Sequence, residues 1–162
     1  MPDSAAIIED NKRLARSMLL DVWQDGKYER FQDILQPDFE RINPHNVARG
    51  YEDYRKVVEL YRMAFSGLHY DIRQMVADER FVAVTYAVSG RHTGPFLWIP
   101  PSWRSGEFMC LDFFEVRDGK LSRVWTLSDD LGLLKAIGLH VVPGPLTALK
   151  AVGLRIKKLF TA

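Results

Sequence analysis

The chain has 162 residues, 47% of them hydrophobic and 12% aromatic, so it is long enough to bury a core of its own as a single globular domain. Its 22 basic and 21 acidic residues give a formal net charge of +1, which offers no electrostatic reason to expect a nucleic-acid partner. The single cysteine, Cys110, excludes an intrachain disulfide and a cysteine-based zinc site, and its apolar surroundings predict a buried, inert thiol.

The first part of the chain predicts helices. Met1–Asp10 lacks the basic and apolar regions of a signal peptide, and no run of 18 apolar residues follows, so we expect a cytoplasmic protein. Pro37 is expected to stop one helix and Gly67 to cap another, and Phe39–Asn43 resembles a short strand before an Asn-Pro-His turn. Apolar residues recur at helical spacing in three segments, which are Ser4–Gln24, Lys27–Gln36 and Tyr51–Phe65.

The following part of the chain predicts a sheet. Four segments alternate with period two or are long apolar runs, namely Leu68–Ala77, Arg80–His92, Ser105–Arg117 and Leu121–Ser128. Asp118-Gly119 indicates a hairpin turn, and Asp129–Ile137 a short closing helix. Helices followed by a meander of long strands predict an α+β fold. We expect a cone-shaped, curved antiparallel sheet wrapped around three N-terminal helices, with a cavity at its open end.

The C-terminal segment, Pro143–Ala162, combines an apolar stripe with basic side chains, which predicts an extra basic amphipathic helix. Such a helix can bind anionic membranes, but its core-like composition favours packing on its own domain or on a partner subunit. We therefore divide the chain into a cone-shaped domain, residues 1–142, and an appended helix, residues 143–162.

Strand alternation assigns side chains to the inner face of the sheet, where a substrate would bind. This face is expected to carry Tyr86, Val84, Val88 and His92, then Phe108, Asp112 and Phe114, and finally Val124, Thr126 and Ser128. Asn43 and His45 of the Asn-Pro-His turn are expected at the mouth. The opposite face of the same strands is also largely apolar, which suggests a homodimer or a cover by the C-terminal helix.

Asp112 is the main catalytic candidate. An ionised carboxylate is costly in a run as apolar as Met109–Phe114 unless it is paired or protonated. A carboxyl with a raised pKa can donate a hydrogen bond to an enolate or move a proton near neutral pH. We predict Asp112 as this acid and His92 as its partner base. In the alternative interpretation Asp112 accepts structural hydrogen bonds and His92 only braces the loop that follows it.

No metal or cofactor is expected. The four histidines, at positions 45, 69, 92 and 140, lack the spacing of metal ligands. Phosphate-binding, dinucleotide-binding and serine-hydrolase motifs are also missing from the sequence.

Several segments between Asn11 and Gly138 together resemble one family. They are Val22-Trp23-Gln24-Asp25-Gly26-Lys27, Leu35-Gln36-Pro37-Asp38-Phe39, Gly50-Tyr51-Glu52-Asp53-Tyr54, Gly90-Arg91-His92-Thr93-Gly94-Pro95-Phe96, and Phe114-Glu115-Val116-Arg117-Asp118-Gly119. This set resembles the SnoaL-like polyketide cyclases, the ester-cyclase branch of the nuclear-transport-factor-like, ketosteroid-isomerase-like superfamily. The resemblance implies a cone-shaped fold, a cofactor-free pocket, a homodimer and enolate chemistry. It also matches Asp112 to the neutral enolate donor of the isomerases.

The cyclases of that family commonly have His where this chain has Asp112, and the chain departs from the family at two other positions. Thr126 stands where many relatives have the Asp of a His-Trp-Asp motif, and Asn43 stands near the position of the isomerase base. Three functions therefore remain open. The first is a cofactor-free cyclase or isomerase acting on an apolar carbonyl compound, with Tyr86 and Thr126 polarising the substrate oxygen. The second is a non-catalytic protein that binds a hydrophobic ligand or a partner, and the third is an epoxide hydrolase using Arg91 and Asp112.

Overall fold

The computed structural model describes residues 3–139. Its elements are α1 (Ser4–Ser17), η1 (Met18–Gln24), η2 (Tyr28–Arg30), α2 (Phe31–Ile34), β1 (Leu35–Asn43), β2 (Asn46–Arg49), α3 (Gly50–Ala64), β3 (Phe65–Ala77), β4 (Phe81–His92), β5 (Ser105–Arg117), β6 (Lys120–Ser128) and α4 (Asp130–Ala136). The α+β class is confirmed. The predicted tail helix, Pro143–Ala162, lies outside the described residues, so it and the division of the chain at residue 142 stay predictions.

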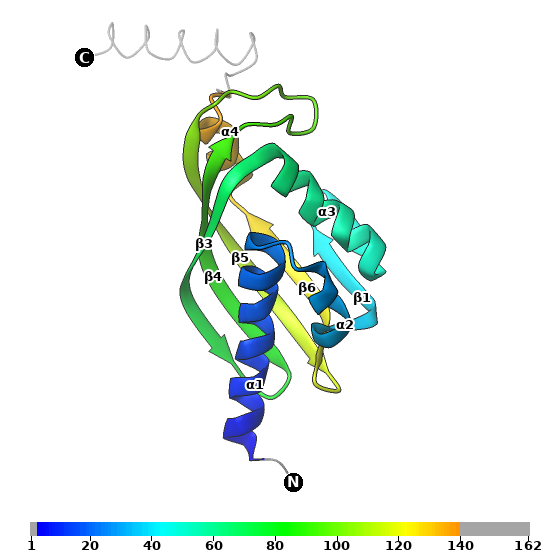
Figure 1. Ribbon diagram of the computed structural model, residues 1–162. Coiled ribbons are helices and arrows are strands. Elements are labelled where there is room, and N and C mark those ends of the chain that lie inside the picture. Colours follow the sequence, from blue (N-terminus) through cyan, green and yellow to red (C-terminus); the bar gives the residue numbers. More distant parts are fainter. Residues whose placement is uncertain (1–2, 140–162) are drawn as a thin grey trace, which may run out of the picture.

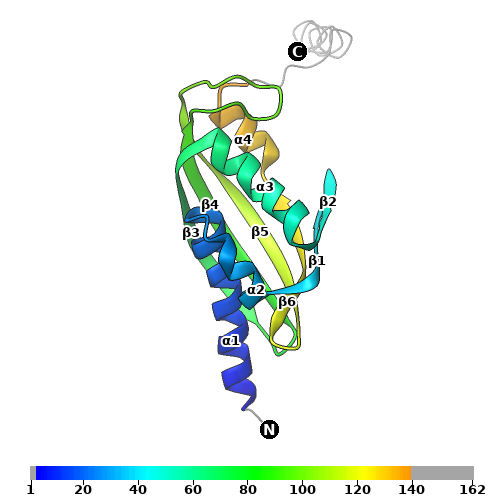
Figure 2. The ribbon, with the colours of Figure 1, turned by 45° about the vertical axis from the view of Figure 1, so that its right-hand side comes forward.

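One six-stranded sheet, in the order β2-β1-β6-β5-β4-β3, curves around the helices. Figures 1 and 2 show α1, α2 and α3 on one face of this sheet and α4 at one end of it. We predicted an antiparallel sheet, but one pair of strands differs, because β1 and β6 pair in parallel. A parallel pair needs a long connection, and here α3 and the strands β3 to β5 separate the two partners.

The first predicted helix consists of two parts. The α-helix ends at Ser17, and a π-helical segment, η1, continues to Gln24. The π-helix has a wider turn than the α-helix. In η1 two adjacent pairs face the core together, and these are Met18 with Leu19 and Val22 with Trp23. The single α-helix expected over Ser4–Gln24 was therefore wrong in its last third.

The second predicted helix is shorter than Lys27–Gln36. A 3-10 turn and α2 end at Ile34, and β1 begins at Leu35. A residue that precedes proline disfavours the α-helical conformation, so the chain becomes extended ahead of Pro37. The pairing of β1 with β6 is irregular between Leu35 and Glu40. Pro37 lies in that irregular stretch, where its missing N–H removes no bond from the regular ladder.

The third helix leads directly into the sheet. It ends at Ala64, and Phe65 already pairs with His92 as the first residue of β3. Gly67 is therefore not the helix cap that we predicted. It lies within β3 with a φ of 62°, where the pairing with β4 shifts register between Ser66 and His69. A glycine adopts this left-handed conformation without the steric cost that a Cβ would bring.

The predicted alternation of side chains in β4 is confirmed. Val82, Val84, Tyr86 and Val88 are buried beneath the helices, as part of the main hydrophobic core. Cys110 is buried as expected. Within residues 3–139, no helix is long and apolar enough to cross a membrane.

Candidate active site

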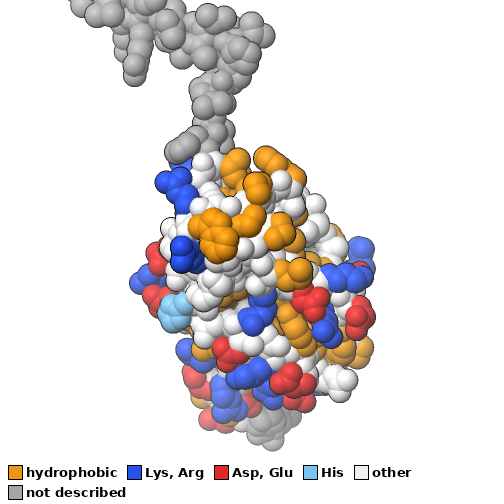
Figure 3. All heavy atoms as spheres, turned by 45° about the horizontal axis from the view of Figure 1, so that its top comes forward, with side chains coloured by type: hydrophobic (Ala, Val, Ile, Leu, Met, Phe, Trp, Pro, Cys, Tyr) orange, Lys and Arg blue, Asp and Glu red, His pale blue; other side chains and the backbone are white. Residues whose placement is uncertain are grey.

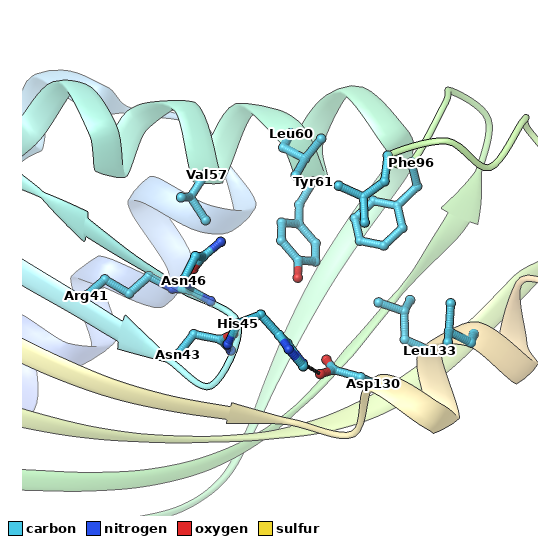
Figure 4. Close-up of a pocket in the computed structure, with 12 residues that line it drawn as sticks. Arg41, Asn43, His45, Asn46, Val57, Leu60, Tyr61, Phe96, Asp130 and Leu133 are labelled. Atoms are coloured by element: carbon cyan, nitrogen blue, oxygen red, sulfur yellow. Dashed lines mark hydrogen bonds and ion pairs between the residues drawn. The ribbon is translucent and has the colours of Figure 1, made fainter.

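A largely apolar cavity lies at the end of the sheet that α4 covers. Figure 4 shows it between α3, the turn that joins β1 to β2, the 93–104 loop and α4. It has a volume of about 250 Å³. Its lining residues are Arg41, Asn43, His45, Asn46, Val57, Leu60, Tyr61, Phe96, Leu97, Asp130, Leu133 and Leu134. The walls are mostly apolar, and the polar groups gather at the β1–β2 turn and the start of α4.

A second, much smaller cavity of about 30 Å³ lies deeper under the helices. It is lined by Trp23, Arg41, Tyr61, Tyr70, Tyr86, Val88, Phe108, Cys110, Thr126 and Ser128. Arg41 and Tyr61 line both cavities, so the two spaces adjoin. A ligand in the outer cavity would therefore have the hydroxyl-rich inner cavity beside it.

The 93–104 loop is held over the outer cavity by close backbone packing. The amides of Thr93 and Gly94 both donate to the carbonyl of Ala64, at 3.0 Å each. A Cβ at Gly94 would lie 2.1 Å from the carbonyl oxygen of Met63, so only glycine fits there. This contact sets Phe96 against Tyr61, with ring centroids 5.2 Å apart.

Apolar side chains continue outward from this loop onto the surface. Leu97, Trp98, Trp103 and nearby Met63 are each at least 60% exposed. Figure 3 shows apolar side chains gathered on this end of the molecule. The end of the protein that carries the cavity therefore offers an apolar surface to an approaching ligand.

Tyr86 and Asp112 form a buried pair beside the inner cavity. The Tyr86 hydroxyl donates to Asp112 Oδ2 at 3.0 Å, and the carboxyl is only 2% exposed. Burial raises the pKa of Asp112 to about 6, although the neighbouring hydroxyls of Thr126 and Tyr86 and the charge of Arg41 act in the opposite direction. Asp112 lines neither cavity. The Tyr86 hydroxyl, which lines the inner cavity, stands between that cavity and the carboxyl.

His92 does not approach Asp112, contrary to our expectation. Asp112 pairs with Val84 of β4, and His92 lies eight residues further along that strand, roughly 26 Å at about 3.3 Å per residue. Its Nδ1 accepts a hydrogen bond from the Ser102 amide at 3.2 Å, and its ring packs on Phe65. Burial lowers the pKa of His92, which keeps the ring neutral. The geometry matches the alternative interpretation, in which His92 braces the loop.

The set expected for an epoxide hydrolase is not assembled either. Arg91 pairs with Ser105, seven residues before Asp112 on β5. Its Nε donates to the carbonyl of Trp103 at 3.0 Å, and its guanidinium lies over the Trp103 ring. Arg91 therefore holds the 93–104 loop from the end of β4 and is not a partner of Asp112.

A histidine with a carboxylate partner does stand at the mouth. His45 Nε2 lies 2.8 Å from Asp130 Oδ2, and Ser128 Oγ donates to Asp130 Oδ1 at 2.6 Å. The His45 amide donates to Asn43 Oδ1, which fixes the turn. Because Asp130 accepts the proton of Nε2, the Nδ1 of a neutral His45 carries a free lone pair. His45 is thus the histidine with the geometry of a base.

The predicted site residues fall into three groups. Those that line the inner cavity are Tyr86, Val88, Phe108, Thr126 and Ser128, and those that line the outer cavity are Asn43 and His45. The Asn43 amide donates to the carbonyl of Thr126 at 3.4 Å, so it is tied to the backbone. Three residues expected to contact substrate lie in the solid core instead, namely Val84, Phe114 and Val124.

Four polar residues of the outer cavity were not predicted, which are Arg41, Asn46, Tyr61 and Asp130. Arg41 shares the inner face of β1 with buried Phe39, so the period-two alternation would have found it. Tyr61 belongs to the apolar stripe of α3, where helical spacing predicts a buried ring and gives no signal for a hydroxyl at a cavity. Among residues 3–139, no three His, Cys, Asp or Glu side chains are placed to hold a metal ion.

The comparisons with known proteins agree with this architecture. The proposed SnoaL-like polyketide cyclase of Jannaschia sp. CCS1 superposes with a TM-score of 0.78 at 22% identity, over 87% of this chain and 100% of that one. AclR of Streptomyces galilaeus, a proposed hydroxylase, superposes with a TM-score of 0.75 at 22% identity, over 96% of this chain and 99% of AclR. IdmH of Streptomyces antibioticus, a proposed polyketide cyclase, superposes with a TM-score of 0.70 at 22% identity, over 80% of this chain and 99% of IdmH. None of the curated proteins matches the sequence.

These likenesses define the fold as NTF2-like, a name that a Burkholderia xenovorans neighbour with a TM-score of 0.66 carries. The family follows from the sequence itself. Residues 13–137 match the SnoaL-like polyketide cyclase family, and the chain belongs to it.

Proposed function

We propose that the protein is a cofactor-free enzyme of the cyclase or isomerase kind, which moves a proton on a carbon beside the carbonyl of an apolar substrate. One observation carries this proposal. The hydroxyl of Tyr86 stands at the inner cavity with the buried carboxyl of Asp112 directly behind it. A donor held in place in an apolar site stabilises the negative oxygen of an enolate far better than water does.

The proton transfer is divided between the two cavities. His45 Nδ1 takes the proton from the carbon, and the C–H electron pair becomes the C=C bond of the enolate while the carbonyl oxygen gains the charge. In this step the carboxyl of Asp112 is protonated and donates to Tyr86 Oη, which leaves the Tyr86 hydroxyl proton free to hydrogen-bond to that oxygen. Asp130 stabilises the imidazolium of His45. The enolate then takes the proton back at another carbon or attacks a second carbonyl. The first outcome is an isomerisation and the second an aldol ring closure.

Exchange of α-protons tests this proposal without knowledge of the natural substrate. 2-Tetralone is an apolar bicyclic ketone, and NMR in D₂O follows the loss of its C1 protons. We expect the protein to accelerate this loss above the rate in buffer and with an equal concentration of serum albumin. A rate equal to that of both controls would contradict the proposal.

The base is tested by His45→Gln. Loss of a positioned general base typically costs a factor of about 100 or more, so we expect the exchange rate to fall by about 100-fold. His69→Gln is the matched control, because His69 is an exposed histidine on β3 that lines neither cavity. Equal rates for the two variants would exclude His45 as the base.

A non-catalytic binding function is the second candidate, and the two departures from the family favour it. Asn43 and Thr126 cannot take up a proton at neutral pH, and Asn43 is tied into its turn. In that case 2-tetralone would bind to the cavity with no gain in its exchange rate. Titration of 2-tetralone, monitored by chemical shifts of the protein, separates this outcome from a failure to bind.

We also propose that two copies associate through the outer face of the sheet. Met109, Leu111, Phe113 and Leu127 are 37–56% exposed there, on neighbouring strands β5 and β6. Phe113 packs between the rings of Phe81 and Trp125 and extends this apolar surface. Two such surfaces from identical chains are complementary, since a twofold axis brings the same residues together.

Light scattering after size exclusion is expected to give twice the chain mass. Leu127→Asp places a charge in the middle of the outer face and should give a monomer of unchanged helix and strand content. Leu131→Asp is the control, because Leu131 is 45% exposed but lies on α4. A monomeric wild-type protein would contradict the proposed dimer.

A further inference from the structure

Arg41 is a buried cation in the wall between the two cavities. It is only 4% exposed, and it lines both of them. Its Nη1 donates to Asn46 Oδ1 at 3.0 Å, while its Nε has no hydrogen-bond partner within residues 3–139. Figure 4 shows the side chain extending from β1 toward Asn46 along the edge of the outer cavity.

Arg41 forms no ion pair with a carboxylate of the residues that the structure describes. The nearest polar partner is an amide, and the ion pairs of the same sheet join other arginines, among them Arg123 with Glu40. The charge of Arg41 lowers the pKa of Asp112, but no ion pair within residues 3–139 joins the two side chains, and Asp112 Oδ2 accepts the hydrogen bond of Tyr86. A guanidinium cannot lose its proton, so its charge remains in the wall of the cavity.

Such a placement is costly in the absence of an anion. Arginine and lysine are almost never buried without a partner, because transfer of a charge out of water is unfavourable. The cost is recovered when an anion binds, since charge-assisted hydrogen bonds are stronger in a site that excludes water. Most of the remaining lining of the outer cavity is apolar, and it includes the carboxylate of Asp130, which disfavours a highly charged anion such as a polyphosphate.

We propose that Arg41 selects substrates that carry a carboxylate on an apolar skeleton. The planar guanidinium binds the planar carboxylate, and the apolar walls formed by α3, Phe96 and α4 enclose the rest of the molecule. The substrate class is thus an apolar keto acid, or the acid derived from a polyketide ester. The inference rests on the proposed function only in that a small molecule enters this cavity.

The test compares two ligands of equal shape, 2-naphthoate and 2-naphthamide, by isothermal titration calorimetry at pH 7.5. The wild-type protein is expected to bind naphthoate at least about 10-fold more tightly than naphthamide, which corresponds to a hydrogen bond to a charged group. Arg41→Gln should remove this preference and leave the affinity for naphthamide within about threefold.

A second pair of variants covers the case in which Arg41→Gln does not fold. Asn46 is exposed and already bonded to the guanidinium, so Asn46→Asp supplies a carboxylate that competes with the ligand. Asn46→Asp should weaken naphthoate binding about 10-fold, and the neutral control Asn46→Ser should change it much less.

The outcomes separate this inference from the proposed function. Equal affinity of the wild-type protein for both ligands, or a preference for naphthoate that survives Arg41→Gln, overturns the role of Arg41 and leaves the proton-transfer proposal standing. If neither naphthoate nor naphthamide binds, the proposal that Arg41 selects substrates with a carboxylate is also overturned. In that case α-proton exchange of 2-tetralone still decides the proposed function by itself.

Discussion

Replacing Tyr86 with Phe is expected to lower the rate of 2-tetralone proton exchange by about 100- to 1,000-fold, as the loss of one oxyanion donor does in other enzymes. The variant keeps the ring in the core and removes only the hydroxyl that points to Asp112. Tyr70→Phe is the matched control. Tyr70 stacks on Tyr86 at 5.8 Å and lines the same inner cavity, so it reports the effect of losing a hydroxyl that is not the donor.

We expect Tyr70→Phe to retain the rate within about threefold, and both variants to melt within a few degrees of the wild type. Equal losses in the two variants would assign the effect to packing. An unchanged rate in Tyr86→Phe would remove Tyr86 from the mechanism.

We expect the difference in folding stability between the Asp112→Asn variant and the wild type to shift in favour of the variant as the pH rises. The folded protein raises the pKa of Asp112 from 3.8 to about 6, so protonation favours the folded state. The stability that this group provides is present below pH 3.8 and is lost as the pH rises through 6. Asparagine does not ionise, so the stability of the variant relative to the wild type should increase by about 2–3 kcal/mol between pH 4 and pH 8.

Urea unfolding at pH 4, 6 and 8 measures this difference. Asp78→Asn is a control of opposite sign, because the backbone amides of Arg80 and Phe81 lower the pKa of the exposed Asp78 carboxyl. Its stability relative to the wild type should fall as the pH rises. A pH-independent difference for Asp112→Asn would mean that the carboxyl is not strained by burial.

The inner face of the sheet was predictable because strand geometry is strict. Successive side chains point to opposite faces, so buried Val82 placed Tyr86 and Val88 beside it, and Asp112 opposite Val84 on the neighbouring strand. The same rule explains the error at His92. Alternation gives the face on which a side chain lies but not its position along the cone, and His92 reaches the far end of β4, where Ser102 binds it.

The helical part was harder to predict, because packing decides it. Nothing in the local spacing of Met18–Gln24 distinguishes an α-helix from the wider π-helix, which depends on the core that both apolar pairs contact. The outer cavity depends on long-range contacts in the same way. His45 and Asp130 are 85 residues apart in the chain, and only the parallel pairing of β1 with β6 brings them together.

A crystal structure with bound 2-naphthol would show directly whether Tyr86 binds the oxygen of an enolate. This compound is an aromatic analogue of the enol of 2-tetralone, so a site built for the enolate should bind it with its oxygen toward the donor. We expect the naphthol oxygen within hydrogen-bond distance of Tyr86 Oη, with the ring system extending past Tyr61 toward His45. A naphthol whose oxygen contacts neither Tyr86 nor Thr126 while its rings fill the outer cavity would contradict this expectation.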